Sequence, residues 1–309
     1  MKRSITFSEA VEGYLLAATA RHLSKHTIRD YLNTYRKFQI FLDHDPPFDK
    51  ITNKQIEAFL AAQIVSKKTV LNYHIGLSAL WTWAIENEIV QEHIVQKVER
   101  VKPEKRSIVP YSEDDVRAML TSLTTSRGYT RPGKKGSQHS LPQAERNRAI
   151  IMLLLDTGIR ATELCELSIN QVDLQNRRVT VFGKGSKERT IPISPRTAQA
   201  IWRYLKTDRQ EDYISERLFT TLNGRPMDRD RLLKSIRSIG KRAGLQGANV
   251  HRFRHTFAIN YLRNGGDPFS LQISLGHSTM EMVKNYLALA QADLEKNHLR
   301  ASPVDHWRL

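Results

Sequence analysis

Residues 251–286, HRFRHTFAINYLRNGGDPFSLQISLGHSTMEMVKNY, bring imidazole, guanidinium and phenol groups together in one short stretch. His251 and Arg254 are three residues apart, so on a helix both side chains lie on one face. His277 follows a predicted short helix that ends in a glycine, and Tyr286 comes nine residues later. Two imidazoles and a guanidinium form a site for an anion, while a phenol supplies a nucleophile. A phosphodiester is the substrate that suits this set of groups.

The spacing H-x-x-R-H, followed by L-G-H and then by a tyrosine, resembles the signature of the tyrosine site-specific recombinases, the phage integrase family. Upstream, the string T-G-x-R-x-x-E-L, which contains Arg160 and Glu163, resembles the first catalytic box of that family. The resemblance implies that Arg160 binds the scissile phosphate and that Glu163 holds its guanidinium in place. Thr162 is a candidate N-cap for the helix that carries Glu163.

Four side chains of the stretch then have expected roles: His251, Arg254, His277 and Tyr286. The two arginines, Arg160 and Arg254, neutralise the non-bridging phosphate oxygens, because the guanidinium fork suits phosphate geometry. Tyr286 attacks, and the resemblance implies a 3′-phosphotyrosyl product. His251 is the candidate base, since an imidazole exchanges protons near neutral pH. His277 donates a further hydrogen bond to the phosphate.

A β-hairpin is predicted over residues 178–193, where two β-rich segments flank the glycine-rich turn GKGSK. In the resembling family a mobile hairpin carries the lysine that acts as general acid. Lys184 matches that position best, and Lys187 is the competing candidate.

The fold implied by the resemblance is mainly α with a small β-sheet. Residues 1–102 would form an N-terminal helical SAM-like core-binding domain, with helices that begin after Ser24, Thr52 and Ser66. Residues 103–110 would form the interdomain linker, and residues 111–309 the mixed α+β catalytic domain with its C-terminal tail. Residues 121–143 are polar and carry four basic side chains, which fits either a tolerated surface insertion or a loop that contacts DNA.

The charge of the 309-residue chain points to a polyanionic partner. Its 48 Lys and Arg against 32 Asp and Glu residues give a net charge of +16, as expected for a protein that binds nucleic acid. Ribosomal and membrane-surface proteins share such a charge, so the charge alone does not identify the partner. The sequence motifs are needed to distinguish these classes of protein. Candidate DNA contacts lie at predicted helix ends, in the hairpin and on a basic helix face: Lys25, Arg29, Lys67, Lys68, Lys187, Arg189, Lys241 and Arg242.

The composition favours a cytoplasmic, nucleoid-associated protein. The single cysteine, Cys165, excludes an internal disulfide and suits a reducing compartment. The sequence has neither an apolar segment of membrane-spanning length nor the apolar core of a signal peptide. It shows no acidic or Cys/His cluster of the kind that binds a metal, and we expect no cofactor.

The predicted function is site-specific recombination, in which strands are cleaved, exchanged through a Holliday junction and rejoined for integration, excision or resolution. Double-stranded DNA with a specific site, a homotetramer and accessory DNA-bending or directionality factors are the expected partners. A type IB topoisomerase is one alternative, although the N-terminal helical domain and short tail favour a recombinase. A non-catalytic DNA-binding protein is another, which Tyr286 argues against. The apolar tail, residues 302–309, either folds back on its own domain or docks in a neighbouring protomer.

Overall fold

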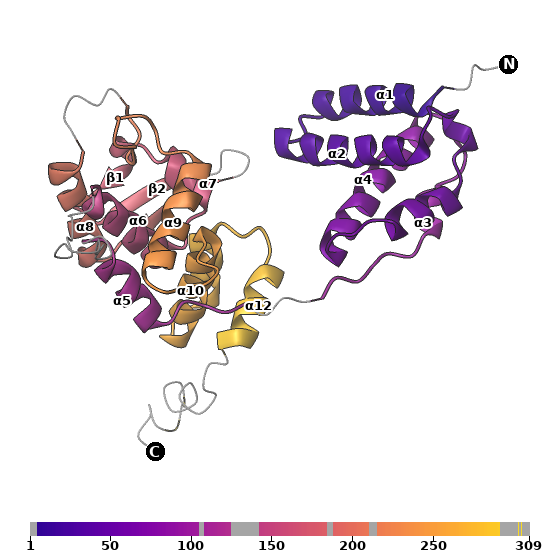
Figure 1. Cartoon of the computed structure of the whole chain (residues 1–309). Helices are drawn as coiled ribbons and strands as arrows, with labels where there is room; N and C mark the ends of the chain where they lie inside the picture. The colour runs from indigo at the N-terminus through magenta and orange to yellow at the C-terminus, as the bar shows by residue number, and fades with distance from the viewer. Residues whose placement is uncertain are drawn as a thin grey trace, which may run out of the picture. The chain divides into compact units, whose positions relative to one another are not determined.

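The chain forms two compact units, Met1–Ser107 and Ile108–Leu309, which Figure 1 shows in a computed structural model. The structure describes residues 5–104, 108–124, 142–183, 188–209 and 215–290, together with 302 and 304. Helices dominate both units, and the described residues contain one small antiparallel sheet. The predicted fold class, mainly α with a small β-sheet, is confirmed. In these ranges no helix has both the length and the apolar character needed to cross a membrane.

The described part of the N-terminal unit, residues 5–104, contains four α-helices: α1 (Phe7–Ala20), α2 (Lys25–Leu42), α3 (Asn53–Ala61) and α4 (Lys67–Glu86). Single 3-10 turns lie at Phe48–Lys50 and Ile94–Lys97. The hydroxyl groups of Ser24, Thr52 and Ser66 each accept a hydrogen bond from the backbone N–H three residues later. These caps satisfy N–H groups that lack a partner inside the helix. The three predicted helix starts are therefore confirmed.

Aromatic side chains fill the core of the N-terminal unit. Phe38 of α2 packs edge-on against Phe7 and Phe59, and Phe48 contacts the fully buried Trp81 of α4.

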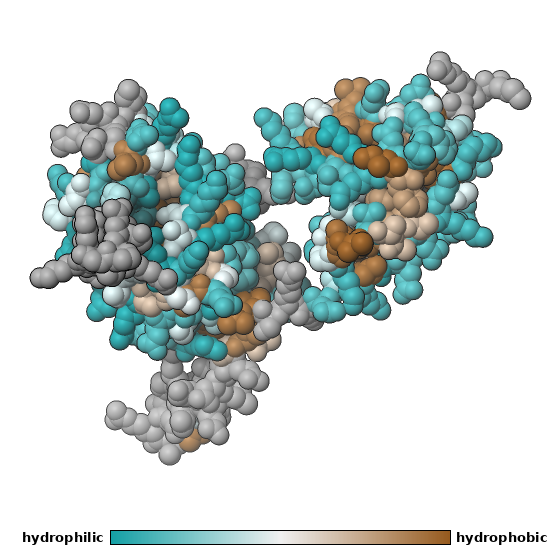
Figure 2. Space-filling view, viewed as in Figure 1, coloured by the Kyte–Doolittle hydropathy of each residue, from teal (hydrophilic) through white to brown (hydrophobic). Residues whose placement is uncertain are grey.

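Figure 2 shows that hydrophilic side chains cover most of the visible face of each unit, interrupted by small apolar patches.

One expected core residue of this unit is misplaced. The sequence predicts that Ile64 faces inward from the helix that begins after Thr52, but Ile64 is fully exposed. The helix ends at Ala61, so Ile64 lies beyond the helical face from which its position was extrapolated.

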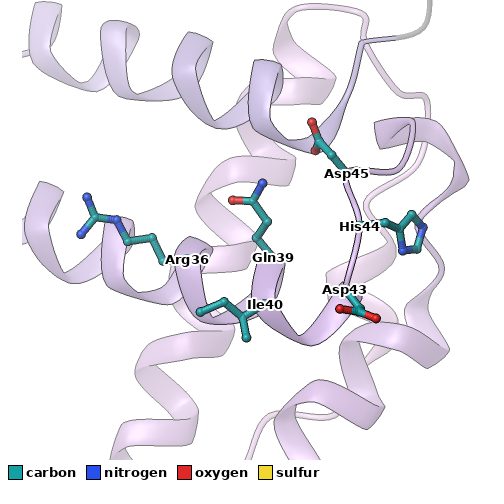
Figure 3. Close-up of a pocket in the computed structure, with 6 residues that line it drawn as sticks. All are labelled: Arg36, Gln39, Ile40, Asp43, His44 and Asp45. Carbon is teal, nitrogen blue, oxygen red and sulfur yellow. The ribbon is translucent and has the colours of Figure 1, made fainter.

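A shallow pocket lies at the C-terminal end of α2 (Figure 3), lined by Arg36, Gln39, Ile40, Asp43, His44 and Asp45. The carboxylates of Asp43 and Asp45 point apart in Figure 3, and Asp45 accepts a hydrogen bond from the backbone of Ser8. Nowhere in the described part of the chain do three or more His, Cys, Asp or Glu residues gather in a way that could hold a metal ion.

The second unit is built around α6 (Ala144–Thr157), which packs against α8 (Pro195–Thr207) and α10 (Val250–Arg263). Five apolar side chains of α6 are buried: Ala149, Ile150, Ile151, Leu153 and Leu154. The other helices of this unit are α5 (Glu113–Thr121), α7 (Ala161–Glu166), α9 (Arg229–Arg242), α11 (Pro268–Leu275) and α12 (Glu281–Ala290), with a 3-10 turn at Ile169–Gln171.

The sheet of the second unit has the order β1 (Val172–Asp173), β2 (Arg178–Phe182) and β3 (Glu188–Pro192), all antiparallel. The predicted hairpin is confirmed, with Val179 opposite Ile191 on the buried face. Strand β1 was not expected, because two residues are too short to show the alternating pattern that identifies a strand.

Helices α10, α11 and α12 form a second small core, and Figure 1 shows α10 and α12 close together. Asp267 caps α11 through the backbone N–H of Ser270. Gly276 ends this helix in the left-handed conformation, which confirms the predicted helix end at a glycine. Val283 and Tyr286 of α12 are buried in the same cluster as Ile259 of α10. The ring of Tyr286 is thereby fixed against α10.

Candidate active site

Arg160 and Glu163 lie at the start of α7, just beyond the glycine turn that ends α6. Arg160 itself is the N-cap, so the prediction that Thr162 caps this helix is wrong. The backbone N–H of Arg160 donates to Glu163 at 2.7 Å, and its guanidinium donates to the same carboxylate at 2.8 Å. Glu163 therefore fixes both the backbone and the side chain of Arg160.

Arg189 of β3 shares the same carboxylate. Its two terminal nitrogens donate to Glu163 at 3.0 and 2.8 Å, and its Nε donates to the carbonyl of Ser274 at 2.8 Å. The sequence predicts a DNA contact for Arg189, whereas the structure leaves only 9% of its side chain exposed. The guanidinium of Arg189 already donates to Glu163 and to the Ser274 carbonyl. Arg189 therefore stabilises the position of Glu163 inside the protein.

Glu163 is an ionised carboxylate between two guanidinium groups. Burial alone would raise the pKa of Glu163, but hydrogen bonds from Arg189 and Arg160 and the charge of Arg189 bring the pKa below its ordinary value. With 3% of its side chain exposed, Glu163 neutralises positive charge that would otherwise be buried without a counter-ion.

Arg254 projects from α10 and is nearly fully buried. Its guanidinium donates to the carbonyls of Gly158 at 2.9 Å and Leu275 at 2.7 Å. Arg160 donates to the next carbonyl, that of Gly276, at 3.1 Å. Burial, followed by the charge of Arg160, lowers the pKa of Arg254 to about 10, so the group stays cationic at neutral pH. The two arginines are thus anchored at the C-terminal end of α11, where their charges add.

His277 follows directly in the turn after α11. Its Nδ1 is buried and has no hydrogen-bond partner among the residues that the structure describes. Burial and then the charges of Arg254 and Arg160 lower the pKa of His277 to about 4, so the imidazole is neutral at physiological pH. A buried nitrogen without a hydrogen-bond partner costs free energy.

Tyr286 faces these groups from α12. Its ring lies parallel to that of His277, with 6.2 Å between ring centroids, and 5% of the residue is exposed. Burial raises the pKa of the Tyr286 phenol, while the charges of Arg254 and Arg160 oppose the rise. The hydroxyl lies 3.0 Å from Nδ1 of His255, which is a hydrogen-bonding distance.

The sequence motifs give no role to His255. A signal was present, because His255 follows His251 by four residues and therefore shares its helix face. The two rings meet at a centroid distance of 4.3 Å. His251, the predicted base, is the most exposed of the three histidines, and burial together with Arg254 and Arg160 lowers its pKa.

The other predicted site residues have varied surroundings. Lys25, Arg29, Lys67, Lys68 and Lys241 are exposed on the described helices. Lys67 pairs with Glu104 at 2.9 Å, and Arg242 is half-buried and donates to the carbonyl of Ser122. Lys184 and Lys187, the candidates for the general acid, lie outside the described residues, as does most of 121–143.

The turn at Gly158 offers a stability test of the site. Gly158 and Gly244 both adopt positive φ, at 60° and 80°, a conformation that costs an L-residue about 1–2 kcal/mol. A Cβ at Gly158 would lie 2.5 Å from Phe257 and 2.9 Å from Leu275, while one at Gly244 would meet nothing within 4 Å. We expect Gly158→Ala to lower the free energy of unfolding measured in urea clearly more than Gly244→Ala. Equal losses would contradict the close packing described at Gly158.

Comparison with known proteins identifies the family. The model of the phage integrase family matches residues 133–293, just over half of the chain, and the model of the phage integrase N-terminal SAM-like domain matches residues 11–91. The tyrosine recombinase XerC of Staphylococcus carnosus is 29% identical over 92% of this chain and 93% of its own length. The tyrosine recombinase XerD of Staphylococcus haemolyticus is 27% identical over 95% of this chain and 98% of its own.

Solved structures agree with this family at the level of the fold. The crystal structure of XerA recombinase covers 96% of this chain and 99% of its own, with 25% identity and a TM-score of 0.51. A lambda integrase tetramer bound to a Holliday junction covers 92% of this chain and 78% of its own, with 17% identity and a TM-score of 0.73. Together with the matched family models, these similarities show that the chain belongs to the phage integrase family, the tyrosine recombinases.

Proposed function

We propose that this protein cleaves and rejoins DNA at a specific site, with Tyr286 as nucleophile and a covalent 3′-phosphotyrosyl intermediate. The observation that carries the proposal is the placement of the Tyr286 hydroxyl beside neutral imidazoles and two buried or half-buried arginines. A purely DNA-binding protein has no use for a buried phenol aimed at such a group of side chains.

The scissile phosphate is bound by the groups at the end of α11. Arg160 keeps about a third of its side chain exposed, and Arg254 supplies a buried charge whose orientation is fixed by two carbonyls. The imidazole of His277 is the proposed further hydrogen-bond donor to a non-bridging oxygen. Fixed positive groups stabilise the additional negative charge of the transition state without reorganisation during the reaction.

Attack by Tyr286 converts the phosphodiester into a protein–DNA ester and releases a 5′-hydroxyl group. The ester conserves the bond energy, so a different strand can displace the tyrosine without ATP. The leaving 5′-oxygen needs a proton, and Lys184 is the proposed donor.

The protein would act as a homotetramer on two DNA sites and exchange strands through a Holliday junction. One structural neighbour was solved as a tetramer on such a junction. Its place of action would be the nucleoid in the cytoplasm, with accessory DNA-bending or directionality factors as partners. The net charge of +16 supports binding to the DNA backbone.

Nicked suicide substrates test the proposal, because loss of the short cleaved fragment traps the covalent intermediate. We expect an adduct that resists denaturation on a substrate with the cognate site, and exchanged strands when two sites are supplied. An adduct without exchanged products would favour the topoisomerase alternative. DNA binding without any covalent adduct would indicate a DNA-binding protein that has no catalytic activity.

Lys184→Ala is expected to slow cleavage by about 10²–10⁴-fold, the usual contribution of a general acid. A substrate with a 5′-bridging sulfur should restore most of the rate, because a thiolate leaves without protonation. Lys187→Ala is the matched control, and single-turnover cleavage is the measurement. Rescue in Lys187→Ala but not in Lys184→Ala would exchange the two assignments.

A further inference from the structure

The hydroxyl group that is to attack the phosphate lies within hydrogen-bonding distance of His255, a histidine outside the predicted set of catalytic residues. His255 lies on α10, and its Nδ1 is 3.0 Å from the Tyr286 hydroxyl on α12. Both helices belong to the same apolar cluster, in which Ile259 and Val283 are buried. The packing of the two helices therefore fixes the distance between the imidazole and the phenol (Figure 1).

The surroundings of His255 keep its imidazole neutral and able to accept a proton. The groups that face the pair are His251 and Arg254 on α10, and Arg160 and His277 across the site. Burial, then the charges of His251 and Arg254, lowers the pKa of His255 to about 4. With its proton on Nε2, the neutral ring presents the lone pair of Nδ1 to the phenol.

We propose that His255, in place of His251, is the catalytic residue that accepts the proton of Tyr286 during strand cleavage. The proposal rests on the proposed function of Tyr286 as the nucleophile. His251, more exposed and also beside Arg254, is then available to bind the phosphate. Each imidazole of the H-x-x-R-H segment thus has a separate task.

The O–H bond of Tyr286 breaks while its oxygen forms a bond to phosphorus, and the proton passes to Nδ1 of His255. The bond between phosphorus and the 5′-oxygen breaks, and that oxygen takes a proton from the general acid. In rejoining, the protonated His255 returns its proton to the departing Tyr286 oxygen, so a complete cycle leaves the histidine neutral.

A weak base is sufficient for this transfer. As the phenol oxygen donates electrons to phosphorus, the hydroxyl proton becomes strongly acidic. An adjacent neutral imidazole can then accept this proton. The negative charge of a bound phosphate also offsets Arg254 and Arg160, two of the cations around the pair. The hydrogen bond is present before substrate arrives, so no rearrangement is needed to start the transfer.

The test compares His255→Gln with His251→Gln in single-turnover cleavage of a nicked suicide substrate. Glutamine can keep a hydrogen bond to the phenol but cannot take its proton. We expect His255→Gln to cleave about 10²–10⁴-fold more slowly. Its rate should rise with pH as the phenol ionises, while the wild-type rate stays flat above the pKa of His255. Thermal unfolding and DNA binding confirm that each variant is folded.

Replacing Tyr286 with trifluorotyrosine, which ionises at much lower pH, separates proton transfer from simple positioning. We expect this amino acid to restore cleavage by His255→Gln to near the rate of the fluorinated parent, and to leave His251→Gln unrescued. Rescue confined to His251→Gln would overturn the proposal, as would a His255→Gln rate equal to wild type. A slow His255→Gln enzyme without rescue would also overturn it, leaving His255 a positioning residue. Failure of the proposed function is distinct, because then the wild-type protein would form no adduct at all.

Discussion

Tyr286→Phe is expected to abolish the covalent protein–DNA adduct while site-specific DNA binding stays close to that of the wild type. The phenolic oxygen is the attacking atom. Phenylalanine removes this oxygen and keeps the ring by which α12 packs against α10. The variant also loses the hydrogen bond to His255, a change of about 0.5–1.5 kcal/mol in the free energy of unfolding. Trapping on a nicked suicide substrate and a binding assay at fixed salt concentration measure the two effects.

Tyr261→Phe is the matched control for this experiment. Tyr261 is a half-buried tyrosine of α10 that packs against the same cluster and stacks at an angle on Phe257. It has no place in the proposed chemistry, so its phenylalanine variant should form the adduct at the wild-type rate. An adduct formed by Tyr286→Phe but lost in Tyr261→Phe would show that the nucleophile has been assigned to the wrong tyrosine.

Local signals in the sequence were sufficient for most of the fold. The caps at Ser24, Thr52 and Ser66 depend on a side chain and a backbone group three residues away, so nearest neighbours determine them. The hairpin likewise follows from alternation and a glycine-rich turn. Ile64 was misplaced because the end of α3 is set by the following turn, which an apolar spacing does not reveal.

The site was harder to predict where partners come from distant segments. Arg189 looks like a surface cation in a basic hairpin, and only the fold brings it to Glu163 and Ser274. In the sequence, His255 resembles a second copy of His251. Only the packing of α12 brings the Tyr286 hydroxyl to His255. In both cases the chemical role depends on a contact made across tens of residues of sequence, which local patterns do not report.

Glu163→Gln should produce the largest loss of stability among single changes in the site. The substitution keeps the shape of the side chain but leaves the buried guanidinium of Arg189 without its counter-ion. Breaking a buried pair in this way costs about 3–5 kcal/mol of unfolding free energy. Glu113→Gln is the control, because it breaks an exposed pair with Arg117 and should change stability far less. Equal losses in the two variants would contradict a buried role for Glu163.

The pH dependence of this loss follows from the lowered pKa of Glu163. A carboxyl group whose pKa is lower in the folded state stabilises the fold above its unfolded pKa of about 4.3, and this contribution disappears as the pH falls through the folded value. The difference in stability between wild type and Glu163→Gln should therefore be full at neutral pH and should shrink in acid. A difference that stays constant down to strongly acidic pH would mean that the carboxylate charge is not its source.

A second substitution separates the two functions of Glu163. Adding Arg189→Met to Glu163→Gln removes both buried charges, so stability should return toward that of the wild type. Cleavage should not return, because Arg160 still lacks the carboxylate that fixes its backbone and guanidinium. Recovery of both stability and single-turnover cleavage would show that Glu163 serves only as the counter-ion of Arg189. Recovery of stability alone would assign to Glu163 the orientation of the arginine that binds the phosphate.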